Sequence, residues 1–160
     1  NVQDQLIAMG VIEPVLDALS FHGDVATVQG CGCAVLGILA TRSKAARAAI
    51  AKLDGVDRVL DALQAHPVVV KVQGCGWAAL GNLVCDNAKN CARFVEFGGI
   101  DLVLDSLRAH PSQLEVQACG MAALRNVLNG TTTGVELVTQ RDGIELIASA
   151  LHGHLEDLTV

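Results

Sequence analysis

The chain repeats itself every 44 residues, and this period limits its possible folds more than any other feature. The register holds over all 160 residues without an insertion. A fixed period of about 20–50 residues is typical of a repeat array, in which each unit packs only on its neighbours. We therefore expect an elongated array with an extended surface for partners. The recurring positions include His22, His66, His110 and His154; Val28, Val72, Val116 and Val160; and Leu19, Leu63, Leu107 and Leu151.

Composition narrows the array to helices. Hydrophobic residues make up 51% of the chain, yet aromatic residues make up only 2%. The apolar residues are mainly Ala, Val, Leu, Ile and Gly, which suit closely packed helices, whereas a β-sandwich needs more aromatic and Thr-rich strands. We therefore expect an all-α fold.

Charge and apolar runs limit the partners. The net charge of −6 argues against nucleic acid as the main partner, because phosphate binding needs clustered Lys and Arg. No apolar run approaches the roughly 18–20 residues that span a bilayer, and no signal-peptide pattern opens the chain. Because it also lacks an initiator Met, we expect a fragment of a longer protein. The basic residues are scattered, and the densest group is Arg42, Lys44, Arg47 and Lys52.

The six cysteines indicate a reducing environment. None is in CxxC spacing, and Cys31, Cys75 and Cys119 occupy the same position of successive repeats. A disulfide framework pairs cysteines within a unit rather than reusing one position. We therefore expect a cytoplasmic location, with the nucleus as the alternative.

The pattern predicts three helices in each repeat. The first is short and ends at an Asp-Gly or Gly-Gly pair, where Gly can adopt the left-handed conformation that stops a helix. The second opens on an acidic residue, which the helix dipole favours, and the longest, the third, follows a His-Pro turn. The expected first helices are Lys44–Leu53, Ala88–Phe97 and Val135–Arg141; the second are Ile12–Phe21, Val56–Ala65, Ile100–Ala109 and Ile144–Gly153; the third are Val25–Ala40, Val69–Val84 and Gln113–Leu128.

A helical wheel divides the third helix into two sides. Gly76 lies on the core side and recurs in the other repeats. Since Gly within a helix costs about 1 kcal/mol relative to Ala, its recurrence indicates that another helix passes too close for a side chain. The core side also holds Val72, Ala79, Leu80 and Leu83, and a small, polar stripe facing away from the core holds Lys71, Cys75, Ala78, Asn82 and Cys85.

The third-helix segments 72–83 and 116–127 resemble those of the armadillo-repeat family, to which importin alpha and beta-catenin belong. Both segments begin with Val-Gln and contain the Ala-Leu-x-Asn pattern of that family. The resemblance covers the whole chain. It implies a right-handed α-solenoid of three-helix repeats, whose third helices line a concave groove for an extended peptide or a protein partner.

The resemblance also assigns candidate binding residues. Asn82 and Asn126 match the family's Asn that hydrogen-bonds the backbone of a bound peptide, whereas the first repeat has Ile38 at this position. Nuclear-import receptors carry Trp four residues before that Asn, and Ala occupies those positions here, so we disfavour an import receptor. The other residues expected to line the groove are Lys71, Cys75, Ala78, Glu115, Cys119 and Ala122.

These residues also have structural interpretations. Asn82 and Asn126 could brace helices instead of binding peptide. Trp77 and Arg125 are candidate anchors for a partner, but we favour packing of Trp77 against a neighbouring repeat and a solvated Arg125. We interpret the repeated His as turn residues facing free helix carbonyls rather than metal ligands. The repeated Cys fit tight helix contacts better than redox sensors.

No catalytic, metal or cofactor motif is found, so we expect no enzyme activity, cofactor or bound metal. The period divides the single domain, 1–160, into repeats at about 1–42, 43–86, 87–130 and 131–160. The first lacks part of its first helix and the last lacks its third. We therefore expect Leu146, Ile147 and Leu151 to stay partly exposed or to be covered by a second copy through weak self-association.

The function that the sequence favours is a protein-interaction scaffold that binds an extended peptide or a protein along the groove. A structural or self-assembling spacer is one alternative. A regulatory module of a larger enzyme, such as a kinase or a ubiquitin ligase, is another, and a metal- or redox-responsive array that uses the cysteines is the third.

Overall fold

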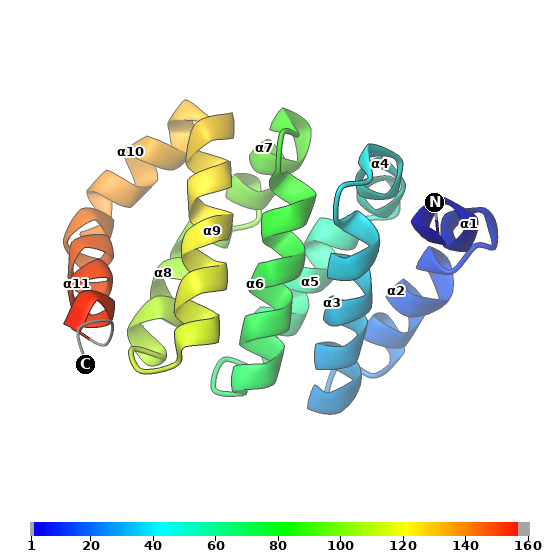
Figure 1. Cartoon of the computed structure of the whole chain (residues 1–160), viewed down its shortest axis with the longest axis horizontal. Helices are drawn as coiled ribbons and strands as arrows, with labels where there is room; N and C mark the ends of the chain where they lie inside the picture. Colours follow the sequence, from blue (N-terminus) through cyan, green and yellow to red (C-terminus); the bar gives the residue numbers. More distant parts are fainter. Residues whose placement is uncertain (1, 157–160) are drawn as a thin grey trace.

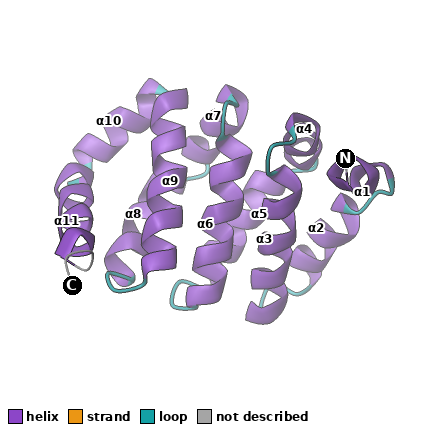
Figure 2. Ribbon diagram, in the orientation of Figure 1, coloured by secondary structure: helices purple, strands orange, loops and turns teal. Residues whose placement is uncertain are grey.

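The computed structural model describes residues 2–156, with the side chains of 5–150 and of His152. This part of the chain is all-α and has no strand (Figure 2). Its eleven helices are α1 (Val2–Ala8), α2 (Ile12–Phe21), α3 (Ala26–Ala40), α4 (Lys44–Lys52), α5 (Gly55–Ala65), α6 (Val70–Val84), α7 (Ala88–Glu96), α8 (Gly99–Ala109), α9 (Leu114–Gly130), α10 (Thr132–Gln140) and α11 (Gly143–Glu156).

Equivalent helices follow one another at the sequence period. Helices α4, α5 and α6 begin at residues 44, 55 and 70, and α7, α8 and α9 begin 44 residues later, at 88, 99 and 114. Figure 1 shows α3, α6 and α9 side by side, with α5 and α8 behind them, α2 beside α3, and α4, α7 and α10 along one edge. Helix α6 packs against both α3 and α9. The three long helices therefore form one continuous face of the molecule.

Most helix ends lie within two residues of their predicted positions, but α10 and α11 differ. Helix α11 extends to Glu156 rather than Gly153, and α10 begins at Thr132 rather than Val135. Glycine is a weak helix former, yet the observed helix includes Gly134. Gly134 is buried within the first turns of α10, where an added Cβ would lie 3.4 Å from Leu128 Cδ2 of α9. Packing against α9 thus overrides local propensity.

Left-handed residues join the first helices to the second. The prediction placed glycine in this conformation, and it is right at Gly98, whose φ is 74°. It is wrong at the two Asp-Gly pairs, where Asp54 and Asp142 adopt it with φ of 57° and 54°. Gly55 is required for space instead, because a Cβ there would lie 2.2 Å from Ile50 Cγ2.

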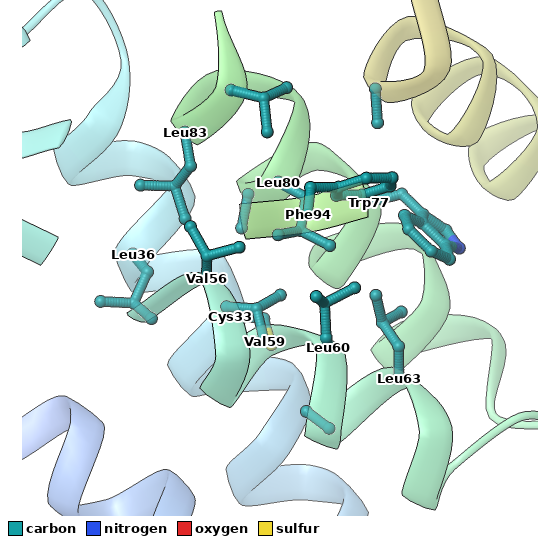
Figure 3. Close-up of a cluster of buried hydrophobic side chains, with 14 of the residues drawn as sticks. Cys33, Leu36, Val56, Val59, Leu60, Leu63, Trp77, Leu80, Leu83 and Phe94 are labelled. Carbon is teal, nitrogen blue, oxygen red and sulfur yellow. The ribbon is translucent and has the colours of Figure 1, made fainter. Parts of the chain in front are cut away.

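The predicted core side of the third helix is confirmed, since Val72, Leu80 and Leu83 are fully buried. A Cβ on Gly76 would lie 2.6 Å from Leu63 Cδ2, so the close approach of α5 explains the recurring glycine. Figure 3 shows that α3, α5, α6 and α7 all contribute to this cluster. Its labelled members are Cys33, Leu36, Val56, Val59, Leu60, Leu63, Trp77, Leu80, Leu83 and Phe94.

The Gln of each Val-Gln pair closes the end of a second helix. Gln73 is buried, and its Nε2 donates to the main-chain oxygens of Leu63 at 2.8 Å and His66 at 3.0 Å. Carbonyls in the last turn of a helix have no intrahelical donor, so the side-chain amide satisfies them. Gln29 and Gln117 make the same pair of bonds at the ends of α2 and α8.

The repeated histidines are turn residues, as predicted, but they contact different carbonyls. His66 Nε2 lies 2.7 Å from Gly23 O, and His110 Nε2 lies 2.7 Å from Pro67 O. Each imidazole therefore reaches the preceding turn rather than its own helix, whose last carbonyls bond the Gln side chains. The side chain of His154 lies outside the described residues.

Helix α11 partly covers the predicted apolar end of the array. Leu146 and Ile147 are half-buried against the core, which agrees with their predicted partial exposure. The side chain of Leu151 and residue Val160 lie outside the described residues. None of the described helices is long and apolar enough to cross a membrane.

Candidate functional site

The candidate site is the solvent-facing side of α3, α6 and α9, which we call the third-helix face. Small side chains run along it, because Ala78 is exposed and Ala34 and Ala122 are half-buried. Ile38, which is 65% exposed, is the large apolar side chain on its α3 part. The middle of the face, where the alanines lie, therefore carries little side-chain bulk. Its charged members are Lys71, Glu115 and Arg125, all of which are exposed.

Glycines bring the three long helices close together. A Cβ on Gly37 would lie 3.3 Å from Ala79 Cα, and a Cβ on Gly81 would lie 3.6 Å from Ala123 Cα. Both glycines occupy the same position of their repeats, since they are 44 residues apart. The main chains of neighbouring helices therefore come within reach of short polar side chains.

Asn82 and Asn126 use this proximity to brace the helices. Asn82 Nδ2 donates to Gly37 O at 3.0 Å and to Thr41 Oγ1 at 3.1 Å. Asn126 Nδ2 donates to Gly81 O at 2.9 Å, on the equivalent carbonyl of α6. Both asparagines therefore brace neighbouring helices, as the structural interpretation predicted. Contact of either side chain with a peptide stays a prediction.

The two asparagines differ in what they can offer a partner. Both amide hydrogens of Asn82 are committed within the chain, so its Oδ1 is the atom that could face a partner. Asn126 makes one such bond, and its Oδ1 lies 3.4 Å from Arg125 Nη2. The residue equivalent to Thr41 in the next repeat is Cys85. Its Sγ lies 3.8 Å from Oδ2 of Asp86.

Lys71, Cys75, Glu115 and Cys119 come together on the first turns of α6 and α9. The side chains of Lys71 and Glu115 lie across the neighbouring helix, because a Cβ on Gly30 would lie 3.3 Å from Lys71 Cγ and one on Gly74 2.8 Å from Glu115 Cδ. The nearby Cys75 and then Glu115 raise the pKa of the Lys71 ammonium. The site residues predicted from the sequence are therefore neighbours in this region.

The cysteines are packing residues to different degrees. The prediction that Cys75 faces away from the core is wrong, since it is only 7% exposed. Burial raises the pKa of the Cys33 thiol to about 12, with Cys75 as a further cause. Burial also raises the pKa of Cys91 and of Cys119, the latter assisted by Glu115. These three thiols are held protonated, which disfavours a redox-sensing role.

Trp77 is a core residue and not a surface anchor. It is 0% exposed, and its Nε1 donates to Ser106 Oγ of α8 at 2.8 Å and to Gln73 Oε1 at 3.2 Å. Ser106 Oγ in turn donates to Gln73 Oε1 at 2.7 Å, which closes a buried triangle. The predicted contact with a neighbouring repeat is confirmed. Arg125, the other candidate anchor, remains on the surface.

Two depressions adjoin the third-helix face. A polar one of about 320 Å³ lies where α6 meets α7 and the end of α9, and Asp86, Asn87, Asn126 and Asn129 line it. An apolar one of about 390 Å³ lies between α2 and α3. Sequence reasoning missed both, because each depends on how helices meet. No cluster of His, Cys, Asp or Glu in the described part could hold a metal ion.

Sequence reasoning also missed the buried polar side chains that join one helix to another by hydrogen bonds. Gln29, Gln73, Gln117 and Ser106 all bond between helices. The recurrence of Gln every 44 residues was a signal for the first three. Nothing in the sequence distinguishes Ser106 from a surface serine, because its equivalents are Ala18 and Ala62.

Comparison with known proteins identifies a family. Residues 5–159 match the family model described as "Protein zer-1 homolog-like, C-terminal domain". Nothing among curated proteins or solved structures matches the chain. Because the family model spans nearly the whole sequence, the chain belongs to the zer-1 homolog-like C-terminal domain family.

Proposed function

We propose that this domain is a protein-interaction module whose third-helix face binds an extended peptide or a protein partner. The observation that carries the proposal is the continuous face of α3, α6 and α9, on which Ala34, Ala78 and Ala122 recur at one position. Small side chains let a partner's backbone come close. Membership of a family of C-terminal domains is compatible with such a module.

The architecture that we propose for the module is a right-handed armadillo solenoid of three-helix repeats, with the third-helix face as its concave groove. The constant offset of 44 residues between equivalent helices supports repeats at 43–86 and 87–130. Gly37 of α3 approaches α6 as Gly81 of α6 approaches α9, and the recurrence of this contact supports a regular stacking of the long helices.

In this proposal the partner is held by polar contacts and not by aromatic pockets. Asn126 can donate its second amide hydrogen, and Asn82 can accept through Oδ1. Lys71 and Glu115 add one charge of each sign at the other end of the helices. The module acts without catalysis, cofactor or metal in this proposal, and we place it in the cytoplasm or the nucleus. The net charge of −6 argues against nucleic acid as its main partner.

One alternative has support from the comparison. The matching family is described as a C-terminal domain, which favours a module that serves within a longer protein. A regulatory part of a ubiquitin ligase or of another large enzyme fits that description. In that case the third-helix face would bind a segment of the enzyme or of its substrate.

Self-association has a separate structural basis. The apolar depression lined by Val15, Val28 and Val35 is open, whereas the equivalent Val59, Val72 and Ala79 are buried by α3 and its neighbours. Arg125 occupies the position that Gly37 and Gly81 hold in α3 and α6, where the missing side chain lets the next long helix come close. The arginine side chain therefore opposes an equally close contact between α9 and a second copy of the chain. We therefore propose at most a weak association, which a concentration-dependent mass above 16.6 kDa would reveal.

The test of the leading proposal is a matched pair of double variants. Ala78→Gln/Ala122→Gln makes the third-helix face bulkier without touching the Asn braces, and Ala65→Gln/Ala109→Gln places the same change on exposed ends of α5 and α8. Proteins captured from a lysate and then mapped on a peptide array should lose binding to the first variant and keep binding to the second. Equal binding to both would refute the third-helix face as the binding surface.

A further inference from the structure

Helix α4 and the turn before it carry a concentration of positive charge that the third-helix face does not use. Residues 42–52 hold four cations and no carboxylate, in a chain whose net charge is −6. Three of the cations are exposed and Arg47 is half-buried. We call this surface the basic edge; its members are Arg42, Lys44, Arg47 and Lys52.

The basic edge is not neutralised by ion pairs within the described residues. The four arginines that do form ion pairs there are Arg58, Arg93, Arg108 and Arg141, none of which belongs to it. Arg47 bonds the Ala40 main-chain oxygen at 3.5 Å, a contact that leaves its charge uncompensated. The basic edge therefore keeps its positive potential.

Among the residues whose side chains are described, carboxylates border the basic edge at its Lys52 end. Lys52 borders a depression of about 440 Å³ together with Lys89 and Arg93, and with the carboxylates of Asp54, Asp57 and Glu96. Three cations and three carboxylates balance there, and Arg93 bonds Asp57 at 2.6 and 3.0 Å. The excess charge therefore lies at the other end, on Arg42, Lys44 and Arg47.

The position of this charge runs against local helix stability. A first helical turn favours carboxylates and disfavours cations, because of the helix dipole. Helices α2, α5, α8, α9 and α11 have an acidic first turn, whereas α3, α4, α6, α7 and α10 have none, and α4 shares a first-turn lysine, Lys44, with α6 and α7.

We propose that the basic edge docks an acidic segment of a protein partner, independently of the third-helix face. Charge complementarity selects that occupant. A membrane surface fits poorly, since the exposed residues between the cations are Ala45 and Ala48 and offer no large apolar group to insert. Nucleic acid fits poorly because phosphate binding needs a longer stripe of Lys and Arg than the three cations at this end of the basic edge.

The test uses two variants that remove the same charge from different places. Arg42→Asn/Lys44→Gln changes the basic edge, with Asn chosen because residue 42 has a φ of 56° and Asn tolerates that conformation. Arg58→Gln/Arg108→Gln removes two exposed cations from α5 and α8, which pair only with carboxylates three residues away and, for Arg108, with Arg141 O. Fluorescein-labelled octaglutamate is the probe, and its binding is followed by anisotropy at low and at high salt.

The basic-edge variant should bind octaglutamate about five- to tenfold more weakly than the parent, and the control variant less than about twofold more weakly. Salt should weaken binding to the parent. The variant Ala78→Gln/Ala122→Gln should bind the probe as the parent does. Absence of binding at low salt, equal losses in the two charge variants, or loss in the Ala78→Gln/Ala122→Gln variant would overturn the proposal. So would tighter binding of an octathymidylate or of phosphatidylserine vesicles than of octaglutamate.

Discussion

The side-chain amide of Asn82 donates a hydrogen bond to the main-chain oxygen of Gly37, 3.0 Å away on the neighbouring long helix. Asn126 repeats the contact one period later, with Gly81 as acceptor. The asparagines therefore set the spacing of the third-helix face before any partner arrives. Their effect on binding has to be separated from their effect on stability.

Removal of the first brace should destabilise the fold. Asn82→Ala deletes two donated hydrogen bonds at a half-buried position, and we expect the free energy of unfolding to fall by about 1–2 kcal/mol. Urea unfolding followed by circular dichroism measures this change. Asn129→Ala is the control, since Asn129 is an exposed residue on the same type of helix. An Asn82→Ala variant as stable as its control would contradict the bracing role.

The close approach of α5 to α6 gives a second prediction. A Cβ at Gly76 would lie 2.6 Å from Leu63 Cδ2, so Gly76→Ala must displace a fully buried leucine. We expect a loss of about 1–3 kcal/mol, which outweighs the gain in helix propensity. Gly23→Ala serves as the control, because nothing lies within 4 Å of a Cβ there. Equal melting temperatures of the two variants would show that Leu63 yields without strain.

The single tryptophan reports on the contact between α6 and α8. Ser106→Ala removes the 2.8 Å acceptor of Trp77 Nε1 and leaves the longer bond to Gln73. We expect a loss of about 1–2 kcal/mol in stability and a shifted Trp77 emission maximum in the folded state. Ser20→Ala, whose hydroxyl bonds only its own helix at Leu16 O, should leave the emission unchanged. An unchanged spectrum for Ser106→Ala would contradict the buried triangle.

The sequence predicted the helices well because the period samples the same structural element several times. Val72, Gly76 and Leu80 have the same residue type at the equivalent positions of the other third helices. A coincidental pattern in one helix therefore has little effect on the prediction. Contacts between elements were harder to predict. A helical wheel gives the direction of Asn82 or Trp77, but it does not give the distance to Gly37 or Ser106, which depends on how closely two helices pack.

The same limit explains the errors at particular residues. The helical wheel places Cys75 opposite the core side of α6, yet α3 and α9 flank α6 closely enough to bury it. Asp54 takes the left-handed conformation because Gly55 is needed next to Ile50. In both cases the deciding interaction comes from a neighbouring chain segment that the local pattern does not contain.

The buried thiol of Cys33 makes stability depend on pH. Burial raises its pKa from 9.0 to about 12 in the folded chain. Below pH 9 the thiol is protonated in both states, whereas above it the unfolded chain loses the proton first. The free energy of unfolding should therefore fall as the pH rises from about 9 towards 12, because the unfolded state then binds fewer protons.

Urea unfolding at pH 8 and pH 10.5 measures this slope, and Cys33→Ala is the variant that tests its origin. Cys33→Ala is expected to be less stable at pH 8, because it leaves a cavity in the core, but to lose less stability between the two pH values. Cys31→Ala, which removes an exposed thiol, is the matched control for the loss of a cysteine. Iodoacetamide at pH 8 should alkylate exposed Cys31 well before Cys33, because the reagent has to reach the sulfur and Cys33 is fully buried. A parent-like slope in Cys33→Ala, or fast alkylation of Cys33, would contradict a protonated, buried thiol.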